Sequence, residues 1–440
     1  MHHATIARIV DAIPPDTQSI RGPGLEEARE LLLSADPEAV LAIEGSFALC
    51  ARAGELVRLA RSLDRPLRYF LAKEADGPML VVSDRIDSIR EILEAEGHAD
   101  QFHPSYTRMV PAHHVLEIRL VGCPDPNPVY RRFFEPARDS LAADIDQIGQ
   151  AYVGALVHQT RRWIESVPAD EPLGVLFSGG IDSGAVLLAV YHSLLELGES
   201  PARLKAFTLS VDGGGRDVEQ ARSFLRETDL ELLGETIEVS KSAVRPLDAV
   251  RVIEDYKALD VECAAVSLAL LQGIRDGYPT WRHLVDGDGG DENLKDYPIE
   301  ENRELSIRSV VNNRMLYHEG WGVDAIKHSL TYSGGLSRGC VRGYAPARRH
   351  GFSLFSPLST PGVIAVSEAI PFRDLTNGSH ARLYALKGEV VSSGIRQLTG
   401  IEMPVFPKRR FQHGAAEAAV TEDLFGSEAE YRRHFASLHV

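Results

Sequence analysis

The stretch at residues 173–183, LGVLFSGGIDS, constrains the fold of this chain more than any other part of the sequence. Its first five residues are apolar, and a run this short is typical of a strand buried in a parallel sheet. A Ser-Gly-Gly turn at residues 178–180 follows, in which glycine lets the backbone approach a ligand closely. An apolar helical pattern then runs from about residue 181 to residue 197 and ends at Gly198. The stretch therefore predicts a strand, a glycine turn and the N-terminus of a helix.

A turn of this kind is an anion-binding site, because the free N–H groups and the dipole of the helix both attract negative charge. Asp182 lies at the same mouth, where its carboxylate would repel a phosphate unless a cation lay between them. We therefore expect a polyphosphate together with a divalent metal. A Walker A loop is excluded, because no Lys directly precedes the Ser. The alternative is an ordinary strand-to-helix turn without a ligand, and the rest of the chain has to decide between the two.

A second unusual segment, DGDGGDE at residues 286–292, places four carboxylates within seven residues. Like charges at this spacing repel one another, and a bound cation or a substrate amine would offset that cost. An EF-hand calcium loop is excluded, because the spacing differs and the Glu at its twelfth position is missing.

Composition limits the classes of function. With 440 residues, the chain is long enough for two domains. Its net charge of −16 argues against nonspecific binding of nucleic acid or anionic membranes. The sequence has no apolar segment long enough to span a bilayer and no secretory signal. Four scattered cysteines indicate free thiols in a reducing compartment and no zinc site. We expect a cytoplasmic protein that binds neither nucleic acid nor membranes.

The pattern of elements changes near residue 140. Residues 1–40 are interpreted as helical segments interrupted by prolines, and residues 40–135 as an antiparallel, β-rich domain with a short helix near residues 86–96. His113 and His114 are expected in a strand, pointing to opposite faces. The sequence predicts a helix over residues 144–167 and then strands alternating with helices, as in an open parallel α/β sheet. We predict two domains, residues 1–140 and residues 141–440.

Three motifs in the second domain occur in the order of one known superfamily. The segment SGGIDS resembles the PP-loop of ATP pyrophosphatases, and DGDGGDE resembles the G-E-G-x-D-E signature of asparagine and β-lactam synthetases. Near the end of the chain, Lys387, Met403-Pro404 and residues 408–411 (KRRF) follow the order of a third motif of these enzymes. The resemblance implies an adenylating synthetase domain with the fold of the adenine nucleotide α-hydrolases.

Short segments of the first domain resemble the glutaminase half of asparagine synthetases: Gly45–Ala48, Arg61–Tyr69, Val82–Asp84 and Pro111–His113. Two positions depart from that pattern. The glutaminase needs Cys as residue 2 for its nucleophile, and this chain has His2. Ser62 stands where an Asp would hold the amine of glutamine. We predict a degenerate, Ntn-like glutaminase domain that does not hydrolyse glutamine.

In the family, a carboxylate attacks the α-phosphate of ATP to give an acyl-adenylate and pyrophosphate, and an amine then displaces AMP. The implied cofactors are ATP and Mg²⁺. For this chain the resemblance implies a pyrophosphate site made of Ser178, Gly179, Gly180, Ser183 and Lys387, and a Mg²⁺ site made of Asp182 and Asp291. Lys408 is implied to stabilise charge during acyl transfer, and Asp288 to orient or deprotonate the amine. The backbone near Leu209, at the end of a predicted strand, is expected to hold the adenine.

Asp217 and a group of four arginines leave alternatives open. Asp217 follows a Gly-rich turn, and it either caps a helix or matches a D-x-x-x-A step of the synthetases. The arginines between residues 338 and 349 either bind a carboxylate or phosphate or form a solvated basic face; they are Arg338, Arg342, Arg348 and Arg349. Residues 351–360 lack the Arg and Asp of the family's acceptor segment, which predicts a substrate other than aspartate.

We therefore expect a synthetase that forms an amide or a lactam from a small-molecule or peptide carboxylate and an amine from a source other than glutamine, in specialised metabolite or peptide biosynthesis. Three alternatives stay open: an ammonia-dependent synthetase fed by a separate amidotransferase, a lasso-peptide-type cyclase, and a non-catalytic nucleotide-binding partner. A sulfur-transfer enzyme is disfavoured, because such enzymes need catalytic cysteines. A homo-oligomer is compatible with the sequence.

Overall fold

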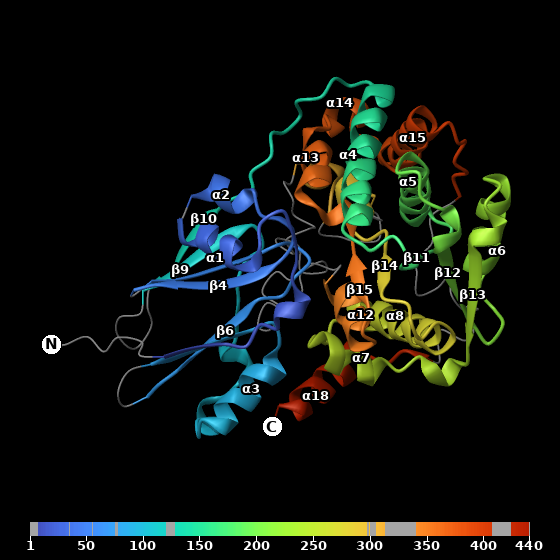
Figure 1. The fold of residues 1–440 in the computed structure, drawn as a ribbon. Helices are drawn as coiled ribbons and strands as arrows, with labels where there is room; N and C mark the ends of the chain where they lie inside the picture. Colours follow the sequence, from blue (N-terminus) through green and yellow to red (C-terminus); the bar gives the residue numbers. More distant parts are fainter. Residues whose placement is uncertain are drawn as a thin grey trace. The chain divides into compact units, whose positions relative to one another are not determined.

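The computed structural model describes residues 8–34, 36–54, 56–74, 78–119, 128–296, 299, 305–312, 340–406 and 424–439. The chain divides into two compact units (Figure 1). The first is built mainly from Met1–Glu135, and the second from Pro136–His318 and Val341–His434. The predicted identities of the two domains, with a boundary at residue 140, stay predictions.

The first unit contains two four-stranded sheets. One has the order β10-β9-β5-β4 and is antiparallel throughout; its strands are Ala48–Ala53 (β4), Leu56–Arg61 (β5), His114–Arg119 (β9) and Val129–Arg132 (β10). The other has the order β1-β7-β6-β8; its strands are Arg8–Asp11 (β1), Arg68–Ala72 (β6), Met79–Ser83 (β7) and Arg108–Met109 (β8).

The core of this unit lies between the two sheets. Val57 and Leu59 of β5 share one buried cluster with Leu80 and Val82 of β7, so the sheets pack face to face. The alternating residues of β7 point the other way and pack on helix α3 (Ile86–Ala95). Helix α1 (Leu25–Ser34) packs against β4. The unit is therefore layered as helix, sheet, sheet, helix.

Residues 8–41 differ in part from the expected helices. The strand β1 pairs parallel with β7, and β2 (Ser19–Arg21) pairs with β3 (Glu44–Ser46). Only α1 and α2 (Pro37–Leu41) are α-helical here. The expectation failed because pairing with distant strands outweighs the weak local pattern. For the same reason the sheet that contains β1 is mixed rather than antiparallel.

The expected position of His113 in a strand is also wrong. It has a φ of 57° and lies in the turn before β9, so it does not alternate with His114 in one strand. Its buried ring packs edge-on against Phe134, which indicates a role in packing.

The second unit is organised around a five-stranded parallel sheet of order β13-β12-β11-β14-β15. Its strands are Leu173–Leu176 (β11), Leu204–Val211 (β12), Gly234–Val239 (β13), His283–Val285 (β14) and Ser353–Phe355 (β15). The predicted strands at 173–177, 204–211 and 283–285 are confirmed, and so is the α/β class. Strand β11 lies in the middle, so the turn that follows it is at the centre of the sheet's carboxyl edge.

Helices cover this sheet; those that matter below are α4 (Ile145–Glu165), α5 (Ile181–Glu196), α6 (Arg216–Glu227), α7 (Pro246–Ile253), α8 (Ala258–Gly277), α12 (Ala345–Arg349), α13 (Pro361–Ala369), α14 (Phe372–Thr376) and α15 (His380–Thr399). Figure 1 shows α4, α5 and α15 side by side. The predicted helix over 144–167 is confirmed, and the Asp144 side chain caps it by accepting hydrogen bonds from Asp146 and Gln147 N–H.

Helices α4 and α15 cross at a pair of glycines. A Cβ at Gly394 would lie 2.2 Å from the carbonyl oxygen of Gly149, so the two backbones touch. This close approach fixes α15, which carries Lys387, against the helices that pack on the sheet.

In the described parts of the chain, no helix has both the length and the apolar character needed to cross a bilayer.

Arg61 generates a stability prediction for the first unit. Its guanidinium is fully buried and donates to four backbone carbonyls, at Val110, Ser62, Leu63 and Arg65, with N···O distances of 2.6 to 3.3 Å. Because Arg61→Ala leaves these carbonyls buried without donors, we expect a loss of about 3 kcal/mol in the free energy of unfolding, measured with urea. Arg52→Ala, at an exposed position of β4, is the control. Equal losses in both variants would contradict this role for Arg61.

Candidate active site

The turn after β11 brings two hydroxyl groups together at the start of α5. Ser178 Oγ and Ser183 Oγ are 3.2 Å apart, and Ser183 Oγ also lies 3.3 Å from the Ser178 N–H. Ser183 Oγ contacts the carbonyl of Gly180, which is the N-cap residue of α5. The first N–H groups of a helix have no acceptor within the helix. The turn therefore presents backbone and hydroxyl donors at the N-terminus of a 16-residue helix.

Gly179 is required by both conformation and space. Its φ is 72°, in the left-handed region that favours glycine. A Cβ there would also lie 2.7 Å from the backbone nitrogen of Ala221 on α6. Helix α6 thus packs directly on the turn and fixes its shape.

The acidic segment at residues 286–292 packs on the same helix start. A Cβ at Gly287 would lie 2.8 Å from the backbone nitrogen of Ser183, and one at Gly290 only 2.0 Å from Asp182 Oδ1. The short helix α9 (Gly290–Leu294) therefore begins against the carboxylate of Asp182. Two motifs that are about 100 residues apart in the sequence form one site.

A buried lysine joins the two acidic segments. Lys387 Nζ lies 2.5 Å from Asp182 Oδ2, 2.5 Å from Asp291 Oδ1 and 3.5 Å from Asp296 Oδ2. The lysine side chain is 3% exposed, whereas Asp182 and Asp291 are 24% and 37% exposed. We call these four residues the Lys387 cluster.

The Lys387 cluster keeps its lysine charged. Burial opposes the ammonium charge, but the carboxylates of Asp182, Asp291 and Asp296 outweigh burial and raise the pKa of Lys387 well above its usual value of 10.5. At neutral pH this lysine is therefore a fixed positive charge and not a base.

Asp182 and Asp291, the two more exposed acids of the cluster, also suit a magnesium ion. Their carboxylates lie close to each other, since one oxygen of each contacts the same Lys387 ammonium group. Mg²⁺ is commonly bound by one or two carboxylates together with substrate phosphates, and it does not need a cage of protein ligands. Within the described ranges, no group of three His, Cys, Asp or Glu residues is arranged to hold a metal ion.

Asp288 lies in a second charged region beside the Lys387 cluster. Its N–H lies 3.2 Å from Asp286 Oδ1, and its carbonyl accepts from Ser359 Oγ at 3.1 Å. The π-helix η8 (Cys340–Tyr344) approaches this turn closely, because a Cβ at Gly343 would lie 2.6 Å from Asp286 Oδ2. π-Helical turns occur often at functional sites.

Arg342, on the same π-helix, forms a largely buried ion pair. Its Nη2 lies 3.0 Å from Oδ1 of Asp260, whose side chain is 1% exposed. Burial opposes its charge, but Cys263 and the acids around it, Asp260 and Asp288 among them, outweigh burial and raise the pKa of Arg342. Arg342 is therefore not part of a solvated basic face, whereas Arg349 on α12 is exposed.

The buried thiols agree with the sequence analysis. Cys50 and Cys263 are buried and form no disulfide, and burial raises the pKa of Cys263 to about 11. Neither thiol is reactive at neutral pH.

The other predicted residues have different outcomes. Leu209 lies two residues beyond Phe207, the last residue of β12 in register with β11, so it is at the carboxyl edge of the sheet. Asp217 is the second residue of α6 and is buried, and the N-cap is Gly215, so the capping interpretation is wrong. Lys408 and Arg338 lie outside the described residues, and their roles stay predictions.

Sequence analysis missed three members of the site. Asp296 completes the Lys387 cluster, and Asp260 pairs with Arg342. Asn293 donates to the hydroxyl of Tyr152 and to the carbonyl of Leu358, which holds α9 in place. The only local signal for Asp296 and Asn293 was their position close to the DGDGGDE segment, and Asp260 had none.

The fold and site define an α/β domain with an anion-binding turn at the carboxyl edge of a parallel sheet. Residues 164–332 match the model of the asparagine synthase family, and this match supports an asparagine synthetase-like superfamily for that part of the chain. Members of this family are ATP-dependent ligases, which makes ATP-dependent amidation the activity that the match supports. The match does not reach residues 1–135, whose relation to glutaminases stays a prediction. A comparison with curated proteins found no match.

The Lys387 cluster predicts a stability effect. Because Lys387→Met leaves three carboxylates around a buried apolar group, we expect the free energy of unfolding to fall by about 3 kcal/mol at pH 7. Lys205→Met, which removes a partly exposed pair with Glu235, should cost less than about 1 kcal/mol. Urea denaturation measures both, and equal losses would contradict a stabilising cluster.

A comparison of wild type with Lys387→Met at different pH values tests whether Lys387 is charged. Since folding raises its pKa, the stabilisation is complete below about pH 10.5 and is lost as pH rises above that value. The difference between wild type and Lys387→Met should therefore stay constant from about pH 8 to about pH 10 and shrink at higher pH. A difference that already shrinks near neutral pH would mean that the lysine is not held charged.

Proposed function

We propose that the second unit adenylates a substrate carboxylate with ATP and then couples the acyl group to an amine that does not come from glutamine. The observation that carries this proposal is the contact of Lys387 with Asp182 and Asp291 beside the Ser-Gly-Gly turn. It combines a fixed positive charge, two carboxylates and the N-terminus of α5 at one edge of the sheet. This combination suits the binding of ATP and the stabilisation of pyrophosphate as its leaving group.

In the first step, a carboxylate oxygen of the substrate attacks the α-phosphorus of ATP. The bond from that phosphorus to the bridging oxygen breaks, and pyrophosphate leaves. We assign pyrophosphate binding to the N–H and hydroxyl donors of residues 178–183, because donors fixed in advance stabilise the charge on the leaving group. Lys387 adds a positive charge that cannot be lost at neutral pH.

Asp182 and Asp291 would hold Mg²⁺ here, and the bound ion would neutralise charge on the phosphate oxygens. The remaining negative charge of pyrophosphate would be stabilised by the donors of residues 178–183 and by Lys387.

In the second step, the amine attacks the acyl carbon, the bond from that carbon to the AMP oxygen breaks, and AMP leaves. The amine has to lose a proton, and we assign the carboxylate of Asp288 to orient the amine and to accept that proton. Its position beside both the Asp286 carboxyl and the π-helix gives it several charged neighbours, which suits a group that orients a cationic amine. Lys408 is proposed to stabilise the charge on the acyl group, as in the family that the motif resembles.

The substrates are proposed to be small-molecule or peptide acids and amines of specialised metabolism, joined as an amide or a lactam. Ammonia from a separate amidotransferase, a lasso-type cyclisation and a non-catalytic nucleotide-binding role are the competing functions. They differ in measurable ways: only the last lacks exchange between ATP and pyrophosphate with every acid tried.

Exchange of labelled pyrophosphate into ATP tests the first step. With a panel of carboxylic acids and Mg²⁺, we expect exchange by the wild-type protein and a loss of at least about 100-fold in Asp291→Asn, because the variant removes a proposed metal ligand. Asp170→Asn, at an exposed position in the turn before β11, is the control and should exchange normally. ATP binding without exchange for any acid would favour the non-catalytic alternative.

Asp288→Asn tests the second step separately. We expect pyrophosphate exchange to persist, since the proposed role of Asp288 begins after pyrophosphate leaves, while amide formation falls by about 100-fold. Mass spectrometry of the coupled product gives the readout. Unchanged amide formation at saturating amine would remove Asp288 from the mechanism.

A further inference from the structure

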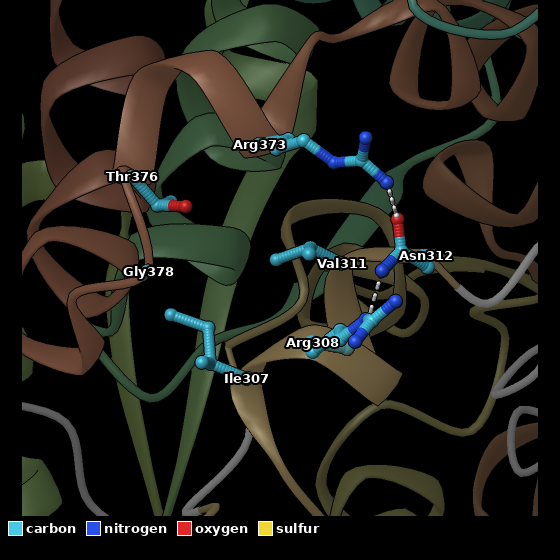
Figure 2. A pocket seen from close by; sticks show the side chains of 7 residues that line it. All are labelled: Ile307, Arg308, Val311, Asn312, Arg373, Thr376 and Gly378. Atoms are coloured by element: carbon cyan, nitrogen blue, oxygen red, sulfur yellow. Dashed lines mark hydrogen bonds between the residues drawn. The ribbon is translucent and has the colours of Figure 1, made fainter.

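A cavity of about 350 Å³ lies between helix α10 (Ile307–Asn312) and the end of α14, outside the Lys387 cluster. This volume is at the lower end of the range for small-ligand sites. Figure 2 shows its lining side chains, which come from both segments. The apolar part is formed by Ile307 and Val311, and the polar part by Arg308, Asn312 and Arg373.

One amide sets the geometry of the polar side. Asn312 Nδ2 donates to the backbone carbonyl of Arg308 at 2.7 Å, which orients the amide. Its Oδ1 then accepts from Arg373 Nη2 at 2.7 Å (Figure 2). Asn312 therefore links α10 to α14 and holds one guanidinium at the cavity.

Two guanidinium groups, those of Arg308 and Arg373, line the cavity. Within the described ranges, no carboxylate lies at ion-pair distance from Arg308 or Arg373, although the chain carries 63 acidic residues against 47 basic ones. By comparison, Arg382 on the neighbouring helix α15 pairs with Glu389. Both arginines are exposed and line the same cavity, so an anion that enters it can meet two guanidinium groups.

We propose that this cavity binds a small organic anion: an apolar body against Ile307 and Val311, with a terminal carboxylate or phosphate that contacts the guanidinium groups of Arg308 and Arg373. Guanidinium groups suit both kinds of oxyanion, because their N–H groups form a planar fork. The proposal does not depend on the ligase activity. The site lies near the cluster along the chain, since α15 begins two residues after Gly378 and reaches Lys387 after about 10 Å of helix.

Binding is tested on the full-length protein without ATP, by saturation-transfer NMR titration of hexanoate, hexyl phosphate, hexylamine and inorganic phosphate. We expect the six-carbon anions to bind and hexylamine not to bind. Inorganic phosphate should bind more weakly than hexyl phosphate, because it leaves the apolar part empty. Whichever of hexanoate and hexyl phosphate has the higher affinity shows whether the site prefers a carboxylate or a phosphate head group. Equal binding of hexylamine, or no binding of either six-carbon anion, would overturn the proposal.

Three variants locate the binding. Arg308→Ala combined with Arg373→Ala should weaken the tighter anion at least about tenfold, because both charge-assisted contacts are lost. Asn312→Asp keeps the shape but supplies an internal carboxylate to Arg373, so it should weaken binding to a similar extent. Arg382 lies outside the cavity and has an acidic partner, Glu389, so Arg382→Ala should bind the anion as tightly as wild type does.

Circular dichroism melting confirms that each variant is folded. Undiminished binding by folded Arg308→Ala/Arg373→Ala, or an equal loss in Arg382→Ala, would show that the anion binds elsewhere and would overturn the proposal. Because no readout involves ATP, failure here leaves the ligase proposal untouched, and failure of pyrophosphate exchange leaves this one untouched.

Discussion

The second unit depends on a buried ammonium group that three carboxylates share. Lys387 comes from α15, Asp182 from the start of α5, and Asp291 and Asp296 from α9 and the residue that follows Lys295. A lysine this deeply buried is stable only when its charge is matched, and the carboxylates would repel one another without it. The same interaction therefore links the stability of the unit to the assembly of the site.

Close backbone contacts make this interaction possible. Gly290 lets the start of α9 meet the Asp182 carboxylate, Gly179 lets α6 meet the turn, and Gly394 lets α15 approach α4. In each case a methyl group would collide with backbone or with the carboxylate. These glycines set distances between segments, and the charges of the Lys387 cluster are effective because those distances are short.

Much of the fold followed from local patterns. The strand and helix around residues 173–197, the helix capped by Asp144 and the strand at residues 204–211 were predictable, because apolar periodicity and capping act within one element. Residues 8–21 were not predictable, since their strands exist only by pairing with distant ones. Asp217 was ambiguous for a similar reason: its burial depends on what α6 packs against.

For the candidate site, the sequence alone determined the glycine turn, the acidic segment and their order, because these are contiguous motifs with distinct local chemistry. It did not determine which charges meet. Lys387 is 205 residues from Asp182 and 96 residues from Asp291, and Asp296 and Asp260 carried no motif of their own. Only the tertiary structure brings these groups within contact distance, because an electrostatic interaction depends on separation in space and burial, and neither is encoded in local periodicity.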